Sequence, residues 1–241
     1  MLSDRIAQVA DLAHLPIHEY SGCALHSELA TGLFPPGDAM LFSILIFDEP
    51  NTAALRDKHR KAHLDYLKAF DGQTVFAGPF TTDDESEDLG SFRLIDLPDR
   101  AAAEKHIADE PYVTGGIQKR WQIHRWRSAV PYTWRDCPRK EGNIQALFYG
   151  LDGPDGMRKR RENQEAHQAY LKAHAGSIMV RGPLLDDTGA EPVGSVWLLD
   201  VPDLDAGRAL LEGDPLYRSG VHKDTMFRRW RFGRVFDRFK V

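Results

Sequence analysis

The stretch AHLDYLKA at residues 62–69 returns almost unchanged as AHQAYLKA at residues 166–173. The offset between them is 104 residues, and the same offset pairs identical residues along most of the chain without a gap. The paired residues include Asp48 with Asp152, Arg56 with Arg160, Gly78-Pro79 with Gly182-Pro183, Gly90-Ser91 with Gly194-Ser195, and Trp126 with Trp230. One register held over this length indicates a tandem duplication.

Each copy predicts the same order of secondary structure. Apolar runs at 41–47 and 144–151 end in Asp-x-Pro, which is typical of a strand followed by a turn. A helical pattern follows in each copy, then a short strand ending in Gly-Pro and a third strand. A second helix begins after Asp99 or Asp203, the expected N-caps, and a last strand closes each copy.

The order strand, helix, strand, strand, helix, strand is that of ferredoxin-like folds. Such a sheet has helices on one face only, so its other face needs a cover. We therefore predict an α+β protein in which two tandem ferredoxin-like domains pack sheet to sheet within one chain. The predicted parts are an extension at 1–39, copy 1 at 40–127, a linker at 128–143 and copy 2 at 144–241.

The first helix of each copy carries a histidine on its apolar face. His63 shares a face with Tyr66 and Leu67 at spacings of three and four, and His167 lies in the same way beside Tyr170 and Leu171. The histidine should therefore face the sheet. Arg56 and Arg160 lie seven residues earlier on the same face, about 10 Å away along the helix.

The fold brings further polar residues to the same end of each copy. The first strand ends there at Asp48 or Asp152, and the second helix ends there at Glu110 or Asp214. A carboxylate can fix the tautomer of a histidine and raise its basicity, as a general base requires, and an arginine can hold an anionic substrate. An inward histidine is also typical of a core residue bonded to backbone or hydroxyl groups, so a packing role stays open.

Taken together, these features resemble the YCII-related domains, small proteins of the dimeric α+β barrel type. The resemblance lies in the Asp-x-Pro strand end, the Arg…Ala-His-x-x-Tyr-Leu helix, the Gly-Pro and Gly-Ser pairs, and Asp-Pro or Glu-Pro followed by tyrosine. It implies dimer-like packing of facing sheets and a His–Asp dyad, which falls on His167 with Asp214. In copy 1 the pair is His63 with Glu110, a departure from aspartate. Characterised relatives remove HCl from chlorinated hydroxyquinols, and the superfamily includes lactone isomerases.

We therefore predict an enzyme that needs no cofactor or metal and acts as a lyase or isomerase on a small aromatic compound or lactone. His167 would move the proton, Asp214 would orient it, and loss of His167 should reduce activity more than loss of His63. The predicted substrate-binding residues are Arg160, Asp152, Gly182, Pro183 and Tyr170, and in copy 1 Arg56, Asp48, Gly78, Pro79 and Tyr66. The alternative is a non-catalytic module that binds a small ligand or a partner.

Composition argues against several other classes. A formal net charge of −5 gives no general attraction to nucleic acids or anionic membranes, and no apolar run approaches the roughly 18 residues that cross a bilayer. Two cysteines and an N-terminus without a secretory pattern predict a reduced, cytoplasmic protein. It is expected to be a monomeric pseudo-dimer or a homodimer of it.

Two flanking segments raise other possibilities. His14, His18, Cys23 and His26 suggest zinc, but Pro16 spoils the helical spacing, so residues 1–39 are expected to form a short helix and a docking arm. The C-terminal run MFRRWRFGRVFDRFK mixes arginine with aromatic residues, as nucleic-acid grooves do. The third strands lack the stacked aromatic residues of RNA-recognition domains, so the run is expected to form a final strand.

Overall fold

The computed structural model describes residues 40–239, with the side chains of 237–239 left aside. The helix and the histidine-rich segment predicted near the N-terminus lie outside the described residues. Copy 1 consists of β1 (Met40–Asp48), α1 (Ala53–Lys68), β2 (Thr74–Thr81), β3 (Asp88–Leu97), α2 (Arg100–Ala108), α3 (Pro111–Thr114) and β4 (Gln118–Trp126).

Copy 2 repeats this series. It consists of β5 (Ile144–Asp152), α4 (Gly156–Ala173), η3 (Ala175–Ser177), β6 (Ile178–Leu185), β7 (Pro192–Val201), α5 (Leu204–Gly213), α6 (Pro215–Arg218), β8 (His222–Trp230) and η4 (Arg234–Phe239). The expected N-caps of the second helices are confirmed, since Asp99 accepts a hydrogen bond from the Ala102 N–H and Asp203 accepts one from the Ala206 N–H.

The eight strands form one closed barrel in the order β1-β3-β2-β8-β5-β7-β6-β4. Within each copy all neighbouring strands are antiparallel, and the copies join where β2 pairs with β8 and β4 pairs with β6. The two seams are short and matched: Phe80 faces Trp230 in one, and Trp126 faces Leu184 in the other. The predicted α+β fold with facing sheets is confirmed, and pairing at both seams leaves no open sheet edge among the described strands.

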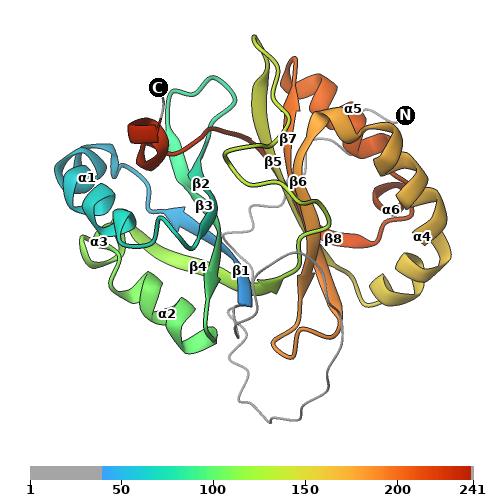
Figure 1. Cartoon of the computed structure of the whole chain (residues 1–241), viewed down its shortest axis with the longest axis horizontal. Coiled ribbons are helices and arrows are strands. Elements are labelled where there is room, and N and C mark those ends of the chain that lie inside the picture. Colours follow the sequence, from blue (N-terminus) through green and yellow to red (C-terminus); the bar gives the residue numbers. More distant parts are fainter. Residues whose placement is uncertain (1–39, 240–241) are drawn as a thin grey trace.

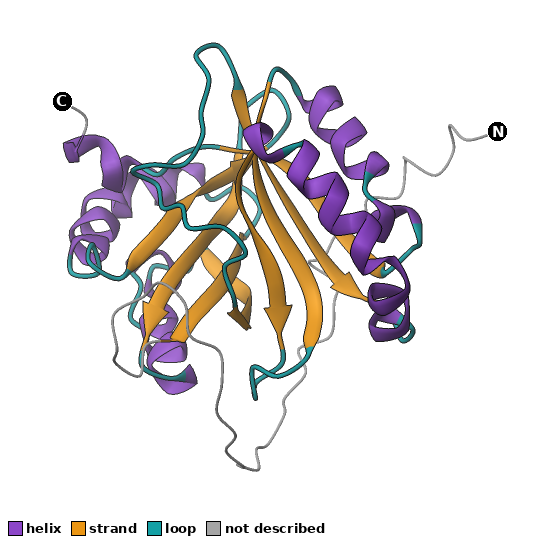
Figure 2. Cartoon of the chain, turned by 45° about the vertical axis from the view of Figure 1, so that its right-hand side comes forward, coloured by secondary structure: helices purple, strands orange, loops and turns teal. Residues whose placement is uncertain are grey.

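The helices cover the outer faces of the barrel, α1 to α3 over copy 1 and α4 to α6 over copy 2 (Figures 1 and 2). One hydrophobic core fills the inside of the barrel with residues from both copies, among them Phe92, Tyr149 and Trp230. Two smaller cores lie between the sheet and the helices, one in copy 1 and one in copy 2. Strands that lie between these cores, such as β1, therefore bury both faces, which accounts for continuous apolar runs such as LFSILIF.

The C-terminal run differs from its expected form. β8 ends at Trp230, and η4 follows instead of a longer strand. This segment leaves copy 2 and packs beside α1 of copy 1, as Figure 1 shows, with Val235 and Phe236 buried against Leu67 and Ala77. The aromatic residues of the run are thus used in packing between the copies.

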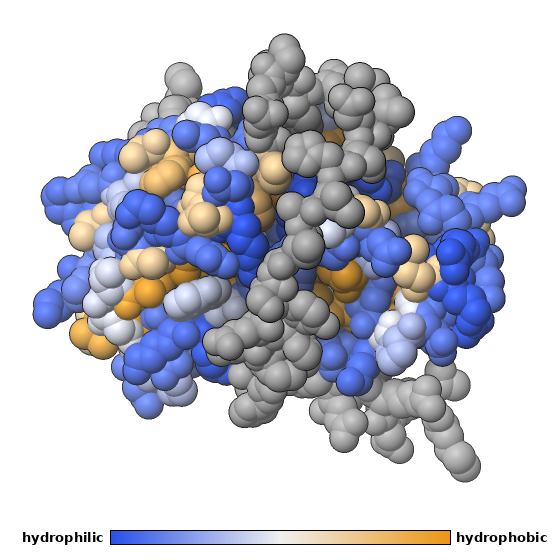
Figure 3. Space-filling model, turned by 90° about the horizontal axis from the view of Figure 1, so that it is seen from below, coloured by the Kyte–Doolittle hydropathy of each residue, from blue (hydrophilic) through white to orange (hydrophobic). Residues whose placement is uncertain are grey.

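The surface outside these cores is largely polar. The face in Figure 3 carries mainly hydrophilic residues outside the grey part, with hydrophobic ones in small groups between them. No helix within residues 40–239 combines the length and the apolar composition needed to cross a membrane.

Candidate functional site

The first site residue of copy 1 is His63, which α1 directs toward the end of α2. Its Nδ1 lies 2.7 Å from Oε1 of Glu110, a residue with no exposed surface. Glu110 is also the N-cap of α3 and accepts a hydrogen bond from the Tyr112 N–H. Pro111 at the first helical position keeps Glu110 extended, so the Glu-Pro pair ends one helix, begins the next and presents the carboxylate to the histidine.

The charges of this pair follow from its surroundings. Burial alone would raise the pKa of Glu110, but the hydrogen bond from His63, the charge of Arg93 and the Tyr112 N–H together lower it to about 2. The carboxylate is therefore ionised and accepts a hydrogen bond from the Nδ1–H of the imidazole. Burial lowers the pKa of His63, although Glu110 opposes this. The ring is then neutral near pH 7, and its Nε2 carries the free lone pair.

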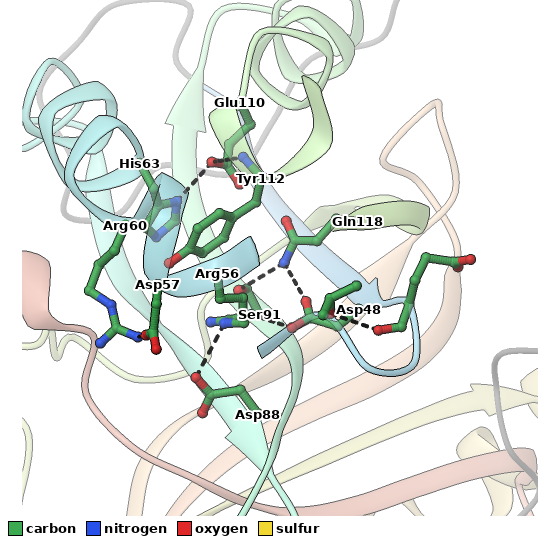
Figure 4. A network of polar contacts seen from close by, with 12 residues as sticks. Asp48, Arg56, Asp57, Arg60, His63, Asp88, Ser91, Glu110, Tyr112 and Gln118 are labelled. Atoms are coloured by element: carbon green, nitrogen blue, oxygen red, sulfur yellow. Dashed lines mark hydrogen bonds and ion pairs between the residues drawn. The ribbon is translucent and has the colours of Figure 1, made fainter. Parts of the chain in front are cut away.

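The His63 ring is part of a stack with Tyr112 and Arg56. Tyr112 stacks on it with ring centroids 4.0 Å apart and an angle of 8°, and the Arg56 guanidinium lies 4.7 Å from the Tyr112 ring centroid. Figure 4 shows the His63 and Tyr112 rings face to face, with Arg56 below them. This stack fixes the plane of the imidazole, so the ring is held on one face by Tyr112 and on one edge by Glu110.

Arg56 is buried and held by acids. Its NH1 lies 2.5 Å from Asp48 and its Nε 3.3 Å from Asp88, and Gln118 donates a hydrogen bond to Asp48 at 2.9 Å (Figure 4). A break in the strand register at Asp48 turns its side chain toward this network. Arg56 is therefore already paired with two carboxylates.

Behind the dyad lies a second buried set. Arg93, 3% exposed, is 3.5 Å from Oε2 of Glu110 and donates to Nε2 of His106 at 2.9 Å. Burial and the charge of Arg93 lower the pKa of His106 to about 3, so this imidazole is neutral and can accept the bond. Tyr66 donates its hydroxyl proton to the backbone carbonyl of His106. Tyr66 thus ties α1 to α2 and does not line the cleft.

An open cleft of about 560 Å³, part of it open to solvent, lies beside His63. Its walls include Gly78 and Pro79 of β2, Tyr112, and the segment 231–235 that follows β8. A Cβ on Gly78 would lie 1.9 Å from the backbone oxygen of Arg231, so glycine is required for the terminal segment to pass so closely. The cleft is therefore built by both copies.

Copy 2 repeats the dyad. Nδ1 of His167 lies 2.5 Å from Oδ1 of Asp214, which caps α6 by accepting a hydrogen bond from the Tyr217 N–H. Asp214 is 1% exposed. Arg160 forms a bidentate pair with Asp152 at 2.6 and 2.8 Å and also donates to Ser195 and to the Gly194 carbonyl. The predicted partners of both dyads thus lie within hydrogen-bond distance of each other.

The surroundings of the second dyad are less polar. Trp197 stands at the position of Arg93, with its ring centroid 6.2 Å from that of His167, and Leu210 stands at the position of His106. His222 replaces Gln118, is buried, and has no hydrogen bond from either ring nitrogen within residues 40–239. Tyr170 donates to the Leu210 carbonyl, as Tyr66 does to His106. Gly182 and Pro183 contact the backbone of Arg127, just after β4: a Cβ on Gly182 would lie 2.0 Å from the Arg127 oxygen, and the Arg127 N–H donates to the Pro183 carbonyl.

Several residues of the copy-1 site have no clear signal in the sequence. Arg93 lies in an apolar strand and His106 in an ordinary helix, so only the barrel shows that they support Glu110. Arg231 and Arg234 belong to the C-terminal run, whose mixture of arginine and aromatic residues does not by itself point to the cleft. The acid-proline pair at matching positions of the two copies is the signal that locates both dyads.

The profile of the YCII-related domain matches residues 40–127 and 144–231, both copies. The chain belongs to this family. No curated protein sequence matches the chain. The structural neighbours are dimeric α+β barrel proteins, so the family and the barrel agree with the predicted fold.

Three solved structures illustrate the likeness. A variant chlorite dismutase from Candidatus Nitrospira defluvii superposes with a TM-score of 0.53 at 8% identity, covering 85% of this chain and 97% of its own. A heme-binding protein from Thermus thermophilus gives 0.49 at 13% identity, over 83% and 95%. The 5-chloro-2-hydroxyhydroquinone dehydrochlorinase of Burkholderia phenoliruptrix AC1100 gives 0.34 at 25% identity, over 36% of this chain and 94% of its own. At 8% identity the chlorite dismutase shows the fold alone.

Proposed function

We propose that the protein is a cofactor-independent enzyme that moves a proton on a small ring compound, as a lyase or an isomerase. The observation that carries this proposal is the His63–Glu110 pair, 2.7 Å apart, with His63 on the wall of an open cleft. His167 with Asp214 forms a second dyad of the same geometry. Family membership supports small-molecule chemistry, and the dehydrochlorinase named above suggests a chlorinated hydroxyquinol as a first substrate to test.

The proposed mechanism uses the free nitrogen of the imidazole. Nε2 of His63 takes a proton from a C–H or O–H group of the substrate, and Glu110 stabilises the imidazolium through Nδ1. In an elimination, the electron pair left behind forms a double bond and chloride departs. In an isomerisation, the imidazolium returns the proton to another carbon. Both reactions balance without an external oxidant or reductant.

The cleft supports placing the first test at copy 1. His63 and Tyr112 lie on its wall, and five arginines also line it. The prediction that His167 carries more of the activity rests on Asp214 matching the family dyad, and an assay decides between the two. Arg56 and Arg160 remain proposed substrate contacts, although the acids beside them already occupy most of their donors.

A binding module without catalysis is the second candidate. The observation that favours it is that both carboxylates already serve as helix N-caps, so the dyads also hold α3 and α6 in place. In this case the histidines complete the packing, and His63→Ala would lower stability through a cavity and would leave ligand chemistry unchanged.

The test is a turnover assay on chlorinated and hydroxylated aromatics and lactones, followed by NMR in D₂O for chloride loss or deuterium uptake. The variants are His63→Ala and Glu110→Gln, with His167→Ala and Asp214→Asn as the matched pair in copy 2. We expect at least one compound to turn over, and His63→Ala to reduce kcat by about 10²-fold or more. Glu110→Gln in the His63→Ala background should add little, since the two act as one unit. A compound that binds but is never converted would favour the binding module.

A further inference from the structure

We propose that the cleft of copy 1 takes a ring compound that bears a carboxylate, and that Arg60 and Arg234 hold this carboxylate. The proposal rests on the proposed function for the reacting end of the substrate. It assigns anion recognition to two residues that line the cleft, one on α1 and one on the segment that copy 2 extends over copy 1.

The charges that line the cleft are uneven. Asp88 is the one acid among the described residues that form its walls, whereas five arginines contribute to them: Arg56, Arg60, Arg93, Arg231 and Arg234. A cleft with this composition attracts an anion and is unfavourable for a cation. A partly enclosed wall also screens these charges less than open water does.

Three of these arginines are already paired with acids of the protein. Arg93 lies beside Glu110, Arg56 lies between Asp48 and Asp88, and Arg231 lies 2.6 Å from Asp88. A substrate anion would have to displace a carboxylate from these pairs. The inner part of the cleft is thus better suited to a neutral ring, with Tyr112 and His63 beside it.

The two outer arginines are held more loosely. Arg60 pairs with Asp57, whose side chain is 72% exposed, three residues earlier on the same helix. Such surface pairs contribute little and exchange readily for another anion. Arg234 is exposed and has no ion pair with any described side chain. In Figure 4 Arg60 points away from the His63–Glu110 pair. The carboxylate of the substrate would then lie beside Arg60, at the outer end of the cleft. The reacting ring of the substrate would lie near His63.

Copy 2 supplies the matched comparison. At the offset of 104, Gln164 stands for Arg60 and Val130 stands for Arg234. Neither matching position around the second dyad therefore carries a cation, while the dyad is kept. Glutamine and valine, the residues at those matching positions, are the natural replacements for Arg60 and Arg234.

The experiment measures binding with two probes that differ in one carboxylate, 2,5-dihydroxybenzoate and hydroquinone, by titration calorimetry at low and moderate salt. The proteins are the full chain, Arg60→Gln, Arg234→Val and the double variant, with Arg158→Gln on α4 as the control. Arg158 is an exposed arginine paired within its own helix, so it matches the charge loss without touching the cleft. Circular dichroism checks that each variant is folded.

We expect 2,5-dihydroxybenzoate to bind more tightly than hydroquinone, and each cleft variant to weaken it by about tenfold, as the loss of one charge-assisted contact predicts. Hydroquinone affinity and the Arg158→Gln protein should be unchanged, and added salt should weaken the acid alone. Equal affinity for the two probes, no binding of either, or an acid affinity indifferent to both cleft variants overturns the proposal.

The two proposals fail in different ways. If the acid binds through Arg60 and Arg234 but no compound is ever converted, the carboxylate site stands and the catalytic proposal falls. If a neutral ring turns over and the outer variants have no effect on KM, the catalytic proposal stands and the carboxylate site falls.

Discussion

The two dyads have the same geometry in different surroundings. His63 lies 2.7 Å from Glu110 and His167 lies 2.5 Å from Asp214, and each acid precedes a proline and caps a short helix. Behind the first dyad are a buried arginine and histidine, and at the same places in the second are Trp197 and Leu210. The dyad is therefore placed by the acid-proline turn, and its surroundings have changed independently.

The exchange of aspartate for glutamate fits this difference. In copy 1 a single oxygen, Oε1 of Glu110, accepts from both His63 and the Tyr112 N–H, which leaves Oε2 toward Arg93. In copy 2 the two oxygens of Asp214 are divided between His167 and the Tyr217 N–H. The longer side chain thus reaches a third partner, and the shorter one suits a site where tryptophan has replaced that partner.

Among the variants that test this difference between the copies, removal of the buried Arg93 should change the free energy of unfolding most. Arg93→Met leaves the Glu110 carboxylate buried with His63 as its remaining side-chain partner, and breaking a buried ion pair typically costs about 3–5 kcal/mol. We therefore expect a loss of about 3 kcal/mol in the free energy of unfolding, measured by urea denaturation.

A double-mutant cycle sharpens this result. Glu110→Gln removes the charge that Arg93 balances, so the double variant should be more stable than the sum of the single losses predicts, by about 1 kcal/mol or more. Strict additivity would show that Arg93 and Glu110, although 3.5 Å apart, do not depend on each other.

The fold was predictable because it depends on features that are local and repeated. The offset of 104, the Asp-x-Pro strand ends and the caps at Asp99 and Asp203 lie along the chain, and one face of each predicted sheet required a cover. The topology of the strands and helices brought each histidine and its acid to the same end of a copy, and the resemblance to the YCII-related domains paired them.

The walls of the cleft were not predictable in this way. Arg231 and Arg234 reach copy 1 because the chain after β8 crosses a seam of the barrel. Arg231 there contacts Asp88 and Gly78, which lie about 150 positions earlier in the sequence. The glycine-proline pairs stay predicted substrate contacts, and Gly78 and Gly182 are in addition required by a backbone that passes within contact distance. Such long-range packing leaves no periodic pattern in the sequence.

The pH dependence of activity offers a second, smaller effect. Since burial lowers the pKa of His63 from 6.5, and a base must be deprotonated, kcat/KM should be constant above about pH 6.5 and fall about tenfold per unit below the lowered pKa. Glu110 raises the pKa of His63 within that balance, so Glu110→Gln should move the acidic limb to still lower pH.

The same pH profile can show which of the two copies carries the activity. It is measured with a substrate from the turnover screen, in wild-type protein and in the Glu110→Gln and Asp214→Asn variants. A limb that moves with Asp214→Asn and ignores Glu110→Gln would assign the activity to His167 and remove it from the cleft of copy 1.

The smallest expected effect concerns a feature that the copies share. Asp99 and Asp203 each accept a hydrogen bond at 2.7 Å from the N–H three residues on, and both side chains lie at the exposed start of the second helix. Replacing an N-cap aspartate with alanine typically costs about 1 kcal/mol, because one N–H at the helix start loses its acceptor. Asp99→Ala and Asp203→Ala should therefore lower the free energy of unfolding by similar amounts, about 1 kcal/mol each.

Asp155 is the control for this pair, since it stands at the N-cap of α4 but its side chain makes no capping hydrogen bond. Asp155→Ala should cost only about 0.3 kcal/mol, the contribution of a negative charge near a helix start. Denaturation midpoints with a common slope measure all three variants. If Asp99→Ala and Asp203→Ala differed by more than the Asp155→Ala loss, the copies would differ in their scaffold as well as in their clefts. Equal losses from Asp99→Ala and Asp203→Ala would show that the N-cap of the second helix contributes the same stability in both copies. The difference between the copies would then lie in the residues around the dyads and not in these helix starts.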